Sequence, residues 1–256
     1  LNDPYAELAT VEDLFSYVER RLESSVTPMD RVRIVRHPQR ICLRDILENV
    51  YDNFTEVGGQ DEHSLDPSML IARAVITRRR GKKIYTQSVM VIGQEKGHGA
   101  EFRNGGSVKP WGNAKALQYM RVAETEGIPI HAYIFTPGSF PIEDYPGAAQ
   151  QIARNIYGMA GLRVPVVSVL LGEGGSGGAL ALALADRVAM QEHAVYSVLS
   201  PEGFASILWK DRTRAAEAGA VMKMSAAEAC EMGIVDAVLS EGAGPAHENP
   251  EQAAEG

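Results

Sequence analysis

The chain has 256 residues, 45% of them hydrophobic and 23% charged, which suits a globular protein with a substantial core. Its formal net charge of −8 and its isoelectric point of about 5.3 argue against a general role in binding nucleic acid. The sequence contains no run of about 18 apolar residues and no basic start followed by an apolar core, so neither a membrane span nor a secretory signal is expected. The two cysteines, Cys42 and Cys230, fit a reducing compartment and form no C-x-x-C metal pair. We therefore expect a soluble, cytoplasmic protein without a metal of its own.

The N-terminal part of the chain is predicted to be helical. Apolar side chains recur at every fourth position within 11–24, with charged residues between them. A second amphipathic helix is expected within 37–54, where Asp45 lies on the polar side and Ile46 on the apolar side. We treat residues 1–60 as an N-terminal helical region.

A β-hairpin is predicted next. The stretch 70–93 alternates in the manner of two strands, and the basic run RRRGKK at 78–83 lies between them. A glycine among charged residues is typical of an exposed turn, so we interpret this basic run as the turn rather than as a ligand-binding patch.

Beyond residue 110, helices and strands alternate regularly. We expect an α/β domain over 61–241, whose sheet is covered by helices, and a flexible tail over 242–256. The expected elements are a helix at 113–127, a strand at 129–135, a helix at 148–162, a strand at 164–171, a glycine loop, a helix at 178–186 and two short strands within 187–199.

The glycine-rich stretch GEGGSGG at 172–178 permits more than one interpretation. Gly172, Gly174 and Gly177 match the G-x-G-x-x-G dinucleotide fingerprint, and Glu192 follows at a suitable distance. Gly178 stands where a Walker A motif requires lysine, which excludes a P-loop. A second turn with glycine, TPG at 136–138, follows the preceding strand and suggests a single site at neighbouring strand ends.

Two other interpretations of these glycines remain open. Adjacent backbone N–H groups at a helix start can stabilise an oxyanion, aided by the helix dipole, and glycine allows close approach. Alternatively, glycines such as Gly172 and Gly174 only allow a helix and a strand to pack closely.

Several motifs, in order and spacing, show that the sequence resembles the alpha subunit of bacterial acetyl-CoA carboxylase carboxyltransferase, a member of the crotonase superfamily. The resemblance covers about 30–250 and favours the oxyanion interpretation over the dinucleotide one. The motifs are RHPQR (36–40), VIGQEKG (91–97), FTPGSFP (135–141), IARN (152–155), VPVVSVLLGEGGSGGALALALADRVAM (164–190), YSVLSPEGFASILWKD (196–211) and GPAHENPE (244–251).

The resemblance implies a crotonase-type spiral of repeated ββα units with flanking helices. It also implies a carboxyl transfer from carboxybiotin on a biotin carboxyl carrier protein to an acyl-CoA, most simply acetyl-CoA to malonyl-CoA in fatty acid biosynthesis. In that family the active site is shared with a beta subunit, which often carries a zinc ribbon, in an α2β2 heterotetramer. The expected cofactor is therefore biotin on a separate carrier, with no metal, nucleic acid or membrane bound by this chain.

By motif match, Gly177 and Gly178 would be the catalytic oxyanion donors on the alpha side. Gly174 and Gly175 would shape the carboxybiotin site, and the facing wall would be formed by Thr136, Pro137 and Gly138. The resemblance requires no side-chain acid or base. We interpret Glu173 as a structural hydrogen-bonding group rather than a base, and we expect His193 and His247 not to be catalytic.

The sequence departs from the family pattern where substrates would enter. Phe135 replaces an acidic residue of the family, and the segments 103–117 and 135–150 lose charged groups. These departures leave the acyl-CoA and the direction of transfer open. The alternatives are a biotin-dependent decarboxylase, a carboxylase for a different acyl-CoA, and a non-catalytic paralogue that only assembles with a beta subunit.

Overall fold

The computed structural model describes residues 26–58, 66–99, 103–142 and 146–255, so the helix expected at 11–24 lies outside the described residues. The strands are β1 (Asn53–Val57), β2 (Met69–Arg80), β3 (Lys83–Gln94), β4 (Ile130–Thr136), β5 (Val166–Gly175), β6 (Arg187–Gln191), β7 (Val195–Ser197) and β8 (Ala237–Leu239). The α-helices are α2 (Pro28–Val35), α3 (Leu43–Val50), α4 (Pro110–Glu126), α5 (Ala148–Ala160), α6 (Ser176–Ala183), α7 (Pro201–Trp209), α8 (Ala215–Met222), α9 (Ala226–Glu231) and α10 (Pro250–Glu255). Two short 3₁₀ helices cover Asn104–Gly106 and Arg212–Arg214.

The described strands form one sheet whose pairing changes from antiparallel to parallel along its width. Its order is β1-β2-β3-β4-β5-β6-β8; β1, β2 and β3 pair antiparallel, and all later neighbours pair parallel. The first half of β5 pairs with β6, and its last three residues pair with β7. Strand β5 therefore changes partner along its length, from β6 to β7. The predicted α/β sheet is confirmed.

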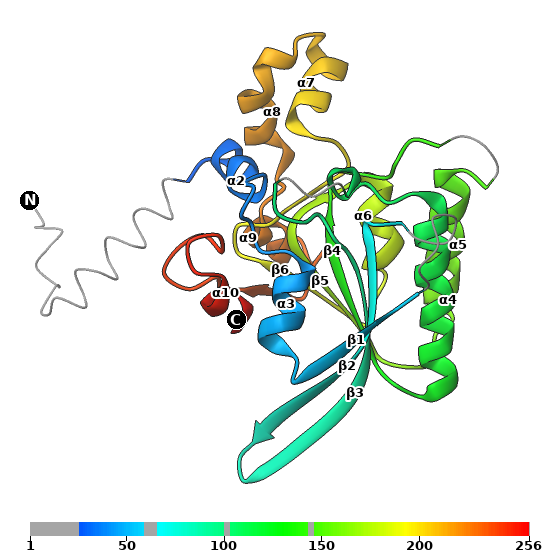
Figure 1. Cartoon of the computed structure of the whole chain (residues 1–256). Helices are drawn as coiled ribbons and strands as arrows, with labels where there is room; N and C mark the ends of the chain where they lie inside the picture. The colour runs from blue at the N-terminus through cyan, green and yellow to red at the C-terminus, as the bar shows by residue number, and fades with distance from the viewer. Residues whose placement is uncertain (1–25, 59–65, 100–102, 143–145, 256) are drawn as a thin grey trace, which may run out of the picture.

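Alternating residues of the central strands build a core on each face of the sheet. On one face, Ile92 and Ile134 join a cluster with Met120 of α4, and α4 lies beside α5 on that side (Figure 1). On the other face, Val91 and Phe135 pack with residues of α3 and α10. The sheet is therefore covered by helices on both faces, as the sequence predicted.

The helix boundaries follow local chemistry. Helix α4 begins at Pro110, three residues earlier than predicted, because proline suits the first turn of a helix. It ends as predicted before Gly127, whose φ of 67° provides the left-handed cap that glycine favours. Helix α6 ends at Ala183 rather than near Asp186, since the backbone turns extended at Leu184. Among the described residues, every helix is too short or too polar to cross a membrane.

The predicted hairpin is confirmed as an arm that projects from the sheet (Figure 1). Strands β2 and β3 pair as far as Arg80 and Lys83, so Gly81 and Lys82 make a two-residue turn. Gly81 has a φ of 62°, a conformation that glycine adopts without strain. The basic residues of 78–83 are exposed, as expected for a solvated turn.

The C-terminal segment differs from the loose tail expected over 242–256. Ala246 and Ala253 are buried, and α10 packs against α3. Small alanine side chains suggested a loose segment, but their size is what lets this segment lie closely on α3. The boundaries of the helical region at 1–60 and of the domain at 61–241 remain predictions.

Candidate active site at the junction of β5 and α6

The glycine-rich stretch is the end of a strand and the start of a helix, not the loop that the sequence suggested. Strand β5 continues to Gly175, and Glu173, Gly174 and Gly175 pair with β7. Helix α6 begins at Ser176, so Gly177 and Gly178 both lie in its first turn. N–H groups in a first helical turn have no acceptor within the helix and lie at the positive end of its dipole. The predicted placement of these two glycines at a helix N-terminus is therefore confirmed, while their catalytic role is not tested by this placement.

The residue that connects the strand to the helix has an unusual backbone. Ser176 has a φ of 54°, in the left-handed region that non-glycine residues rarely adopt, and its side chain is exposed. Such a conformation costs on the order of 1–3 kcal/mol and is enriched at functional sites. Ser176 is the point at which the chain changes from the extended backbone of β5 to α6.

The turn after β4 lies directly against this first helical turn. A Cβ atom added to Gly178 would lie 2.7 Å from the carbonyl carbon of Gly138 and 2.7 Å from the nitrogen of Ser139. A Cβ atom on Gly175 would overlap the carbonyl group of Pro137. The structure thus brings together the glycine residues and the turn that the sequence assigned to a facing wall, in contact between backbones.

The facing turn is held by its own hydrogen bonds. The hydroxyl of Thr136, which is fully buried, donates to the carbonyl of Gly138 at 2.8 Å and accepts from the Gly138 N–H at 3.1 Å. Gly138 has a φ of 148°, which favours glycine at this position. The geometry of the wall therefore depends on both residues.

Gln94 is a positioning residue that sequence reasoning missed. Its amide group accepts a hydrogen bond from the N–H of Phe135 at 3.1 Å and donates to the carbonyl of Gly178 at 2.7 Å. The side chain is fully buried, so it fixes the end of β4 to the first turn of α6. It lies within the motif VIGQEKG, but nothing in the sequence marked this residue as the link.

Glu173 is engaged in an ion pair. The guanidinium of Arg36 donates to Glu173 Oε1 at 2.8 Å, and its other terminal nitrogen donates to Glu202 Oε1 at 2.8 Å. Desolvation alone would lower the pKa of Arg36, but its bonds to Glu173 and Glu202 raise that pKa above its usual range. Arg36 therefore ties α7 to the end of β5, which supports the structural interpretation of Glu173.

The glycines earlier in the stretch serve close packing. A Cβ atom on Gly172 would lie 2.6 Å from the ring of Phe135, and one on Gly174 would overlap Leu170. Phe135, which replaces an acidic residue of the family, is buried below Gly172, and the ammonium of Lys96 lies 4.7 Å from its ring centroid. Burial lowers the pKa of Lys96. The ring of Phe135 thus makes an apolar contact with β5 at Gly172.

A mainly apolar cavity of about 260 Å³ opens beside the first turn of α6. It is lined by Ser176, Gly177, Leu180, Tyr196, Ser197, Val198 and Ile234. Val198 and Leu180 expose 77% and 46% of their surface, an exposure that marks this face as one suited to an apolar ligand or a partner. Backbone donors thus border an apolar hollow.

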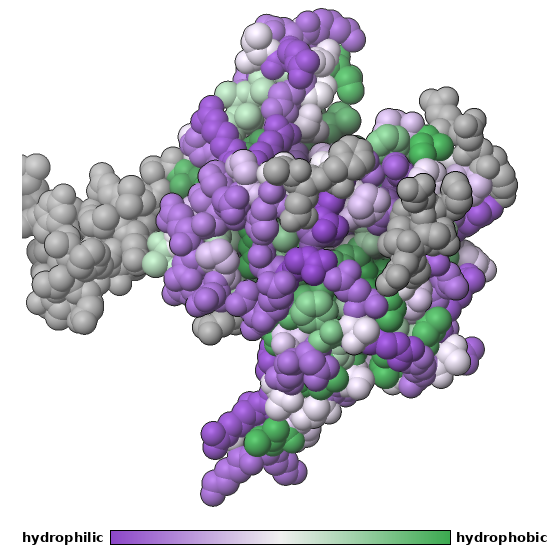
Figure 2. Space-filling view, in the orientation of Figure 1, coloured by the Kyte–Doolittle hydropathy of each residue, from purple (hydrophilic) through white to green (hydrophobic). Residues whose placement is uncertain are grey.

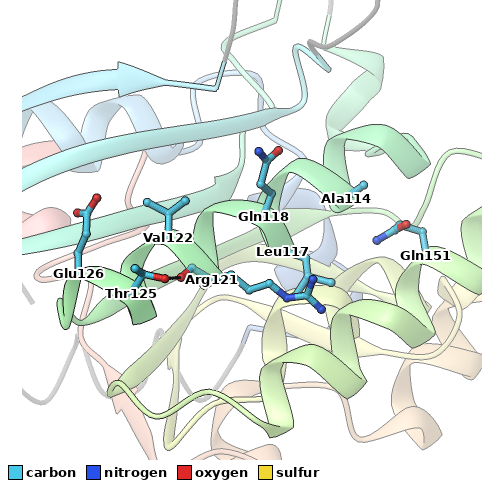
Figure 3. A pocket seen from close by; sticks show the side chains of 8 residues that line it. All are labelled: Ala114, Leu117, Gln118, Arg121, Val122, Thr125, Glu126 and Gln151. Atoms are coloured by element: carbon cyan, nitrogen blue, oxygen red, sulfur yellow. Dashed lines mark hydrogen bonds between the residues drawn. The ribbon is translucent and has the colours of Figure 1, made fainter.

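A second hollow, of about 500 Å³, lies on the outer side of α4 and reaches α5 (Figure 3). Its lining comprises Ala114, Leu117, Gln118, Arg121, Val122, Thr125, Glu126 and Gln151, none of which belongs to the predicted site. The carboxylate of Glu126 pairs with Arg73, and the hydroxyl of Thr125 donates to the carbonyl of Arg121 at 2.9 Å. Because this hollow contains none of the predicted site residues, we do not assign the active site to it.

His193 belongs to a buried ionic network rather than to the site. Its backbone N–H donates to Glu241 at 2.9 Å, and Arg40 forms a buried ion pair with the same carboxylate. Arg40 also donates to the carbonyl of Leu171 at 2.8 Å, just before the glycines. Desolvation would raise the pKa of Glu241, but His193 and Arg40 outweigh it and lower that pKa to about 2. His247 stacks on His37, with ring centroids 4.1 Å apart.

Comparison with known proteins agrees with this arrangement. A family model described as acetyl co-enzyme A carboxylase carboxyltransferase-like matches residues 2–256. The chain is 41% identical to the acetyl-coenzyme A carboxylase carboxyl transferase subunit alpha of Halorhodospira halophila, over 97% of this chain and 77% of that protein. It is 45% identical to a protein of Salinispora arenicola named as subunits beta/alpha, over 86% of this chain and 38% of that protein.

Solved structures share the fold at low sequence identity. The transcarboxylase 12S structure matches with a TM-score of 0.65 and 19% identity, over 91% of this chain and 44% of that chain. A single-chain, multi-domain long-chain acyl-CoA carboxylase matches with a TM-score of 0.60 and 18% identity, over 90% of this chain and 22% of that chain. The chain spans less than half the length of these structures. The predicted crotonase-type fold is confirmed, and the chain belongs to the family of acetyl-CoA carboxylase carboxyltransferase alpha subunits.

Proposed function

We propose that the chain is the alpha-type subunit of a biotin-dependent acyl-CoA carboxyltransferase, which moves a carboxyl group from carboxybiotin on a carrier protein to acetyl-CoA. The observation that carries this proposal is the pair of glycines in the first turn of α6. Their N–H groups need an acceptor from outside the helix, and Gly177 lines an apolar cavity. The membership of the chain in the alpha-subunit family supports the same reaction.

The residues at the site fit the proposed group. The cavity beside Gly177 is mainly apolar, which suits the thiophane ring and the aliphatic chain of biotin, and the backbone of Ser176 and Gly177 lies at its border. Carboxybiotin, when bound, supplies the carboxyl group and a ureido oxygen that gains negative charge as this group leaves. In our proposal the N–H groups of Gly177 and Gly178 donate to this oxygen, and the positive end of α6 adds to the stabilisation.

The remaining residues of the site keep those donors in place. Gly174 and Gly175 let β5 approach β7 and the facing turn, and that turn (Thr136, Pro137 and Gly138) forms the opposite wall. Preorganised donors are effective because they need no rearrangement when charge develops. By holding the donors in place, these residues therefore contribute to the rate. No side chain of this chain acts as a base in the proposal, and Glu173 only holds Arg36.

We propose a beta-type subunit as the partner, in an α2β2 assembly, with the acyl-CoA bound mainly by that subunit. Exposed apolar side chains on the projecting α7 and α8 support a protein partner: Ile207, Leu208 and Val221 each expose more than half of their surface (Figures 1 and 2). The relative named as subunits beta/alpha supports a close association of the two subunit types.

Reconstitution tests this function. The chain is purified alone and together with a beta-type subunit, and biotin-dependent carboxyl exchange is measured with malonyl-CoA, methylmalonyl-CoA and longer acyl-CoA esters. We expect activity only in the complex and the highest kcat/KM for the acetyl/malonyl pair. Higher activity with another ester would reassign the acceptor, net decarboxylation without transfer would favour a decarboxylase, and a well-assembled but inactive complex would favour a non-catalytic paralogue.

A further inference from the structure

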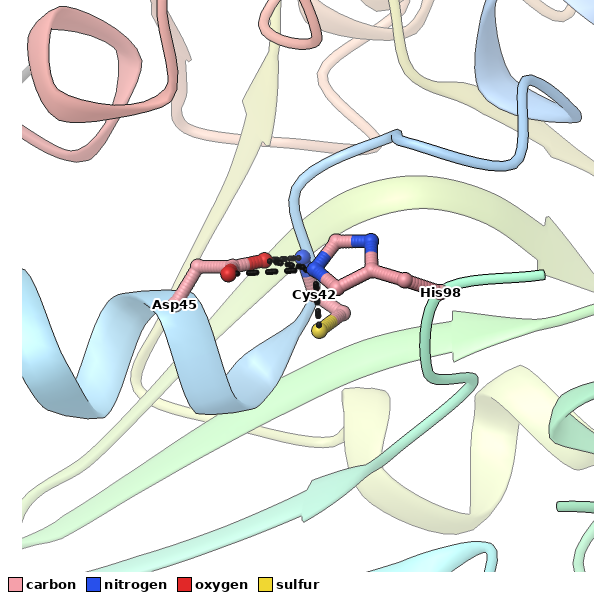
Figure 4. Close-up of side chains that lie close together, drawn as sticks. All are labelled: Cys42, Asp45 and His98. Atoms are coloured by element: carbon pink, nitrogen blue, oxygen red, sulfur yellow. Dashed lines mark hydrogen bonds and ion pairs between the residues drawn. The ribbon is translucent and has the colours of Figure 1, made fainter. Parts of the chain in front are cut away.

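Three potential metal ligands of different chemical types meet outside the candidate active site (Figure 4). Cys42 immediately precedes α3, Asp45 lies in the first turn of that helix, and His98 follows β3. The Sγ atom of Cys42 lies 3.5 Å from Nε2 of His98, and the two carboxylate oxygens of Asp45 lie 2.9 and 3.1 Å from the same nitrogen. One ligand atom from each residue falls within 4.8 Å of the other two.

Local hydrogen bonds hold these groups in place. The N–H of Cys42 donates to Asp45 Oδ2 at 2.7 Å, which fixes the carboxylate beside the thiol. Nδ1 of His98 lies 3.3 Å from the carbonyl of Pro38, a partner that can only accept, so Nδ1 carries a proton. Nε2 lies within hydrogen-bond distance of the Asp45 carboxylate, which also only accepts, so this nitrogen carries a proton when no metal is bound. Once that proton is lost, its lone pair can bind a metal while Nδ1 stays bonded to Pro38, the arrangement found around metal-bound histidines.

A buried carboxylate joins the same two segments. Glu95 accepts hydrogen bonds from the N–H of Arg44 at 2.8 Å and from the N–H of Gly97 at 2.6 Å, so it links the start of α3 to the loop after β3. Glu95 is 1% exposed. This carboxylate holds Cys42 and Asp45, at the start of α3, beside His98, in the loop after β3.

The spacing of the donor atoms matches a common metal ion. For tetrahedral zinc, bond lengths of about 2.3 Å to sulfur and about 2.0–2.1 Å to nitrogen place the two atoms about 3.5–3.6 Å apart. The observed separation of Cys42 Sγ and His98 Nε2 is 3.5 Å. A zinc-bound nitrogen and carboxylate oxygen lie about 3.3 Å apart, so the 3.1 Å between His98 Nε2 and Asp45 Oδ1 needs only a small adjustment.

We propose that Cys42, Asp45 and His98 form a zinc site. A thiolate and an imidazole favour Zn²⁺ over Mg²⁺ and Ca²⁺, which prefer oxygen ligands alone. Binding releases two protons to solvent, one from the thiol of Cys42 and one from Nε2 of His98. Water takes the fourth position, because the side chains of His98 and Asp45 are 30% and 23% exposed. The ion would fasten α3 to the loop after β3. This site departs from our expectation that the chain carries no metal.

The test uses the full chain, reduced and freed of metal with a chelator. Zn²⁺ is titrated in competition with a chromophoric chelator, and Co²⁺ serves as a spectroscopic probe of sulfur ligation. We expect one zinc per chain, a sulfur-to-cobalt charge-transfer band, and a rise in the melting temperature on addition of Zn²⁺. Cys42→Ser should abolish the band, and His98→Gln should weaken zinc binding at least tenfold. Cys230→Ser, which changes the other cysteine, should leave all three results unchanged.

Two results would overturn the proposal. A zinc stoichiometry that is equal in the native chain and in Cys42→Ser would place the ion elsewhere, for example on the stacked His37 and His247. A cluster that functions only as a His98–Asp45 ion pair would give no cobalt–sulfur band, and His98→Gln would then lower the melting temperature equally with and without Zn²⁺. Circular dichroism of each metal-free variant verifies that it is folded before binding is compared.

Discussion

The junction of β5 and α6 and the Cys42–Asp45–His98 cluster present their polar atoms in different ways. The first uses backbone N–H groups of adjacent residues, and close contact with the facing turn leaves no room for a side chain at Gly175 or Gly178. The second uses side chains from segments more than 50 residues apart. The backbone site is therefore sensitive to atoms added where it touches the facing turn, whereas the side-chain site is sensitive to the identity of each donor.

The largest effect is expected from Gly178→Val. The new Cβ would meet the backbone of Gly138 and Ser139 at 2.7 Å, so the facing turn or α6 must move. Carboxyl transfer by the complex with the beta-type subunit should fall by about two orders of magnitude or more, as for the loss of an oxyanion donor. The loss arises from the displaced wall, because an added side chain points toward this turn.

Gly177→Ala is the matched control for that substitution. Its Cβ would approach only the end of the Ile152 side chain, at 3.2 Å, which can shift. Turnover should therefore be reduced much less than in Gly178→Val, and sizing of both complexes shows whether assembly is retained. Equal losses in the two variants would mean that the contact with the facing turn is not what matters.

The ionic network of Arg40 and Glu241 is adjacent to both regions, because Arg40 lies two residues before Cys42 and donates to the carbonyl of Leu171 in β5, and this network is sensitive to acid. The pKa of Glu241 is lowered from 4.5 to about 2, so its contribution to stability is complete above pH 4.5 and is lost as the pH falls toward 2. This contribution is on the order of 3 kcal/mol. Urea unfolding between pH 7 and pH 3 should show Glu241→Gln to be less stable at neutral pH, with a smaller further loss in acid. If the free energy of unfolding of Glu241→Gln fell with pH as steeply as that of the native chain, Glu241 would not be the group responsible.

A smaller effect is expected at Gln94, whose amide group joins the wall to α6. Gln94→Leu leaves the N–H of Phe135 and the carbonyl of Gly178 without this partner, at a cost of about 1–3 kcal/mol for each buried group. We expect a lower melting temperature and about a tenfold loss of kcat, with little change in KM for the acyl-CoA, because our proposal assigns its binding mainly to the beta-type subunit. A rise in KM for the acyl-CoA with unchanged kcat would contradict this positioning role and would indicate that Gln94 contacts the substrate.

The smallest effect is expected from Glu173→Gln. The substitution keeps an acceptor for Arg36, which also retains its ion pair with Glu202. Turnover should stay within a few-fold of the native value over the pH range of the assay, because glutamine still accepts a hydrogen bond from Arg36, although this bond is weaker than one to a carboxylate. A collapse of activity would instead identify Glu173 as a base.

Local sequence patterns predicted most of the fold. The hairpin, the glycine that ends α4 and the alternation of helices and strands each follow from a few adjacent residues, such as Gly81 and Gly127. The end of β5 was predicted incorrectly, because glycines suggest a loop, whereas pairing with β7 keeps Gly174 and Gly175 in the strand. Partners distant in sequence decided that conformation.

The candidate site was predictable only in its contiguous parts. The motif placed Gly177 and Gly178 at a helix start, and the turn at 136–138 was identified as its neighbour. Gln94 could not be identified as the link, because its two partners lie 41 and 84 residues further along the chain. The same limitation applies to Cys42 and His98, since no short motif contains both residues.

Replacing a single N–H group tests the central claim most directly. An amide-to-ester exchange at position 177, with glycolic acid in place of Gly177, removes this donor and adds no side chain, and the first turn of α6 loses no internal hydrogen bond. The proposed role predicts a loss of about 100-fold or more in carboxyl transfer by the assembled complex, which corresponds to roughly 2.7–4 kcal/mol of transition-state stabilisation. Near-native transfer by a correctly assembled ester variant would contradict the assignment of Gly177 as an oxyanion donor.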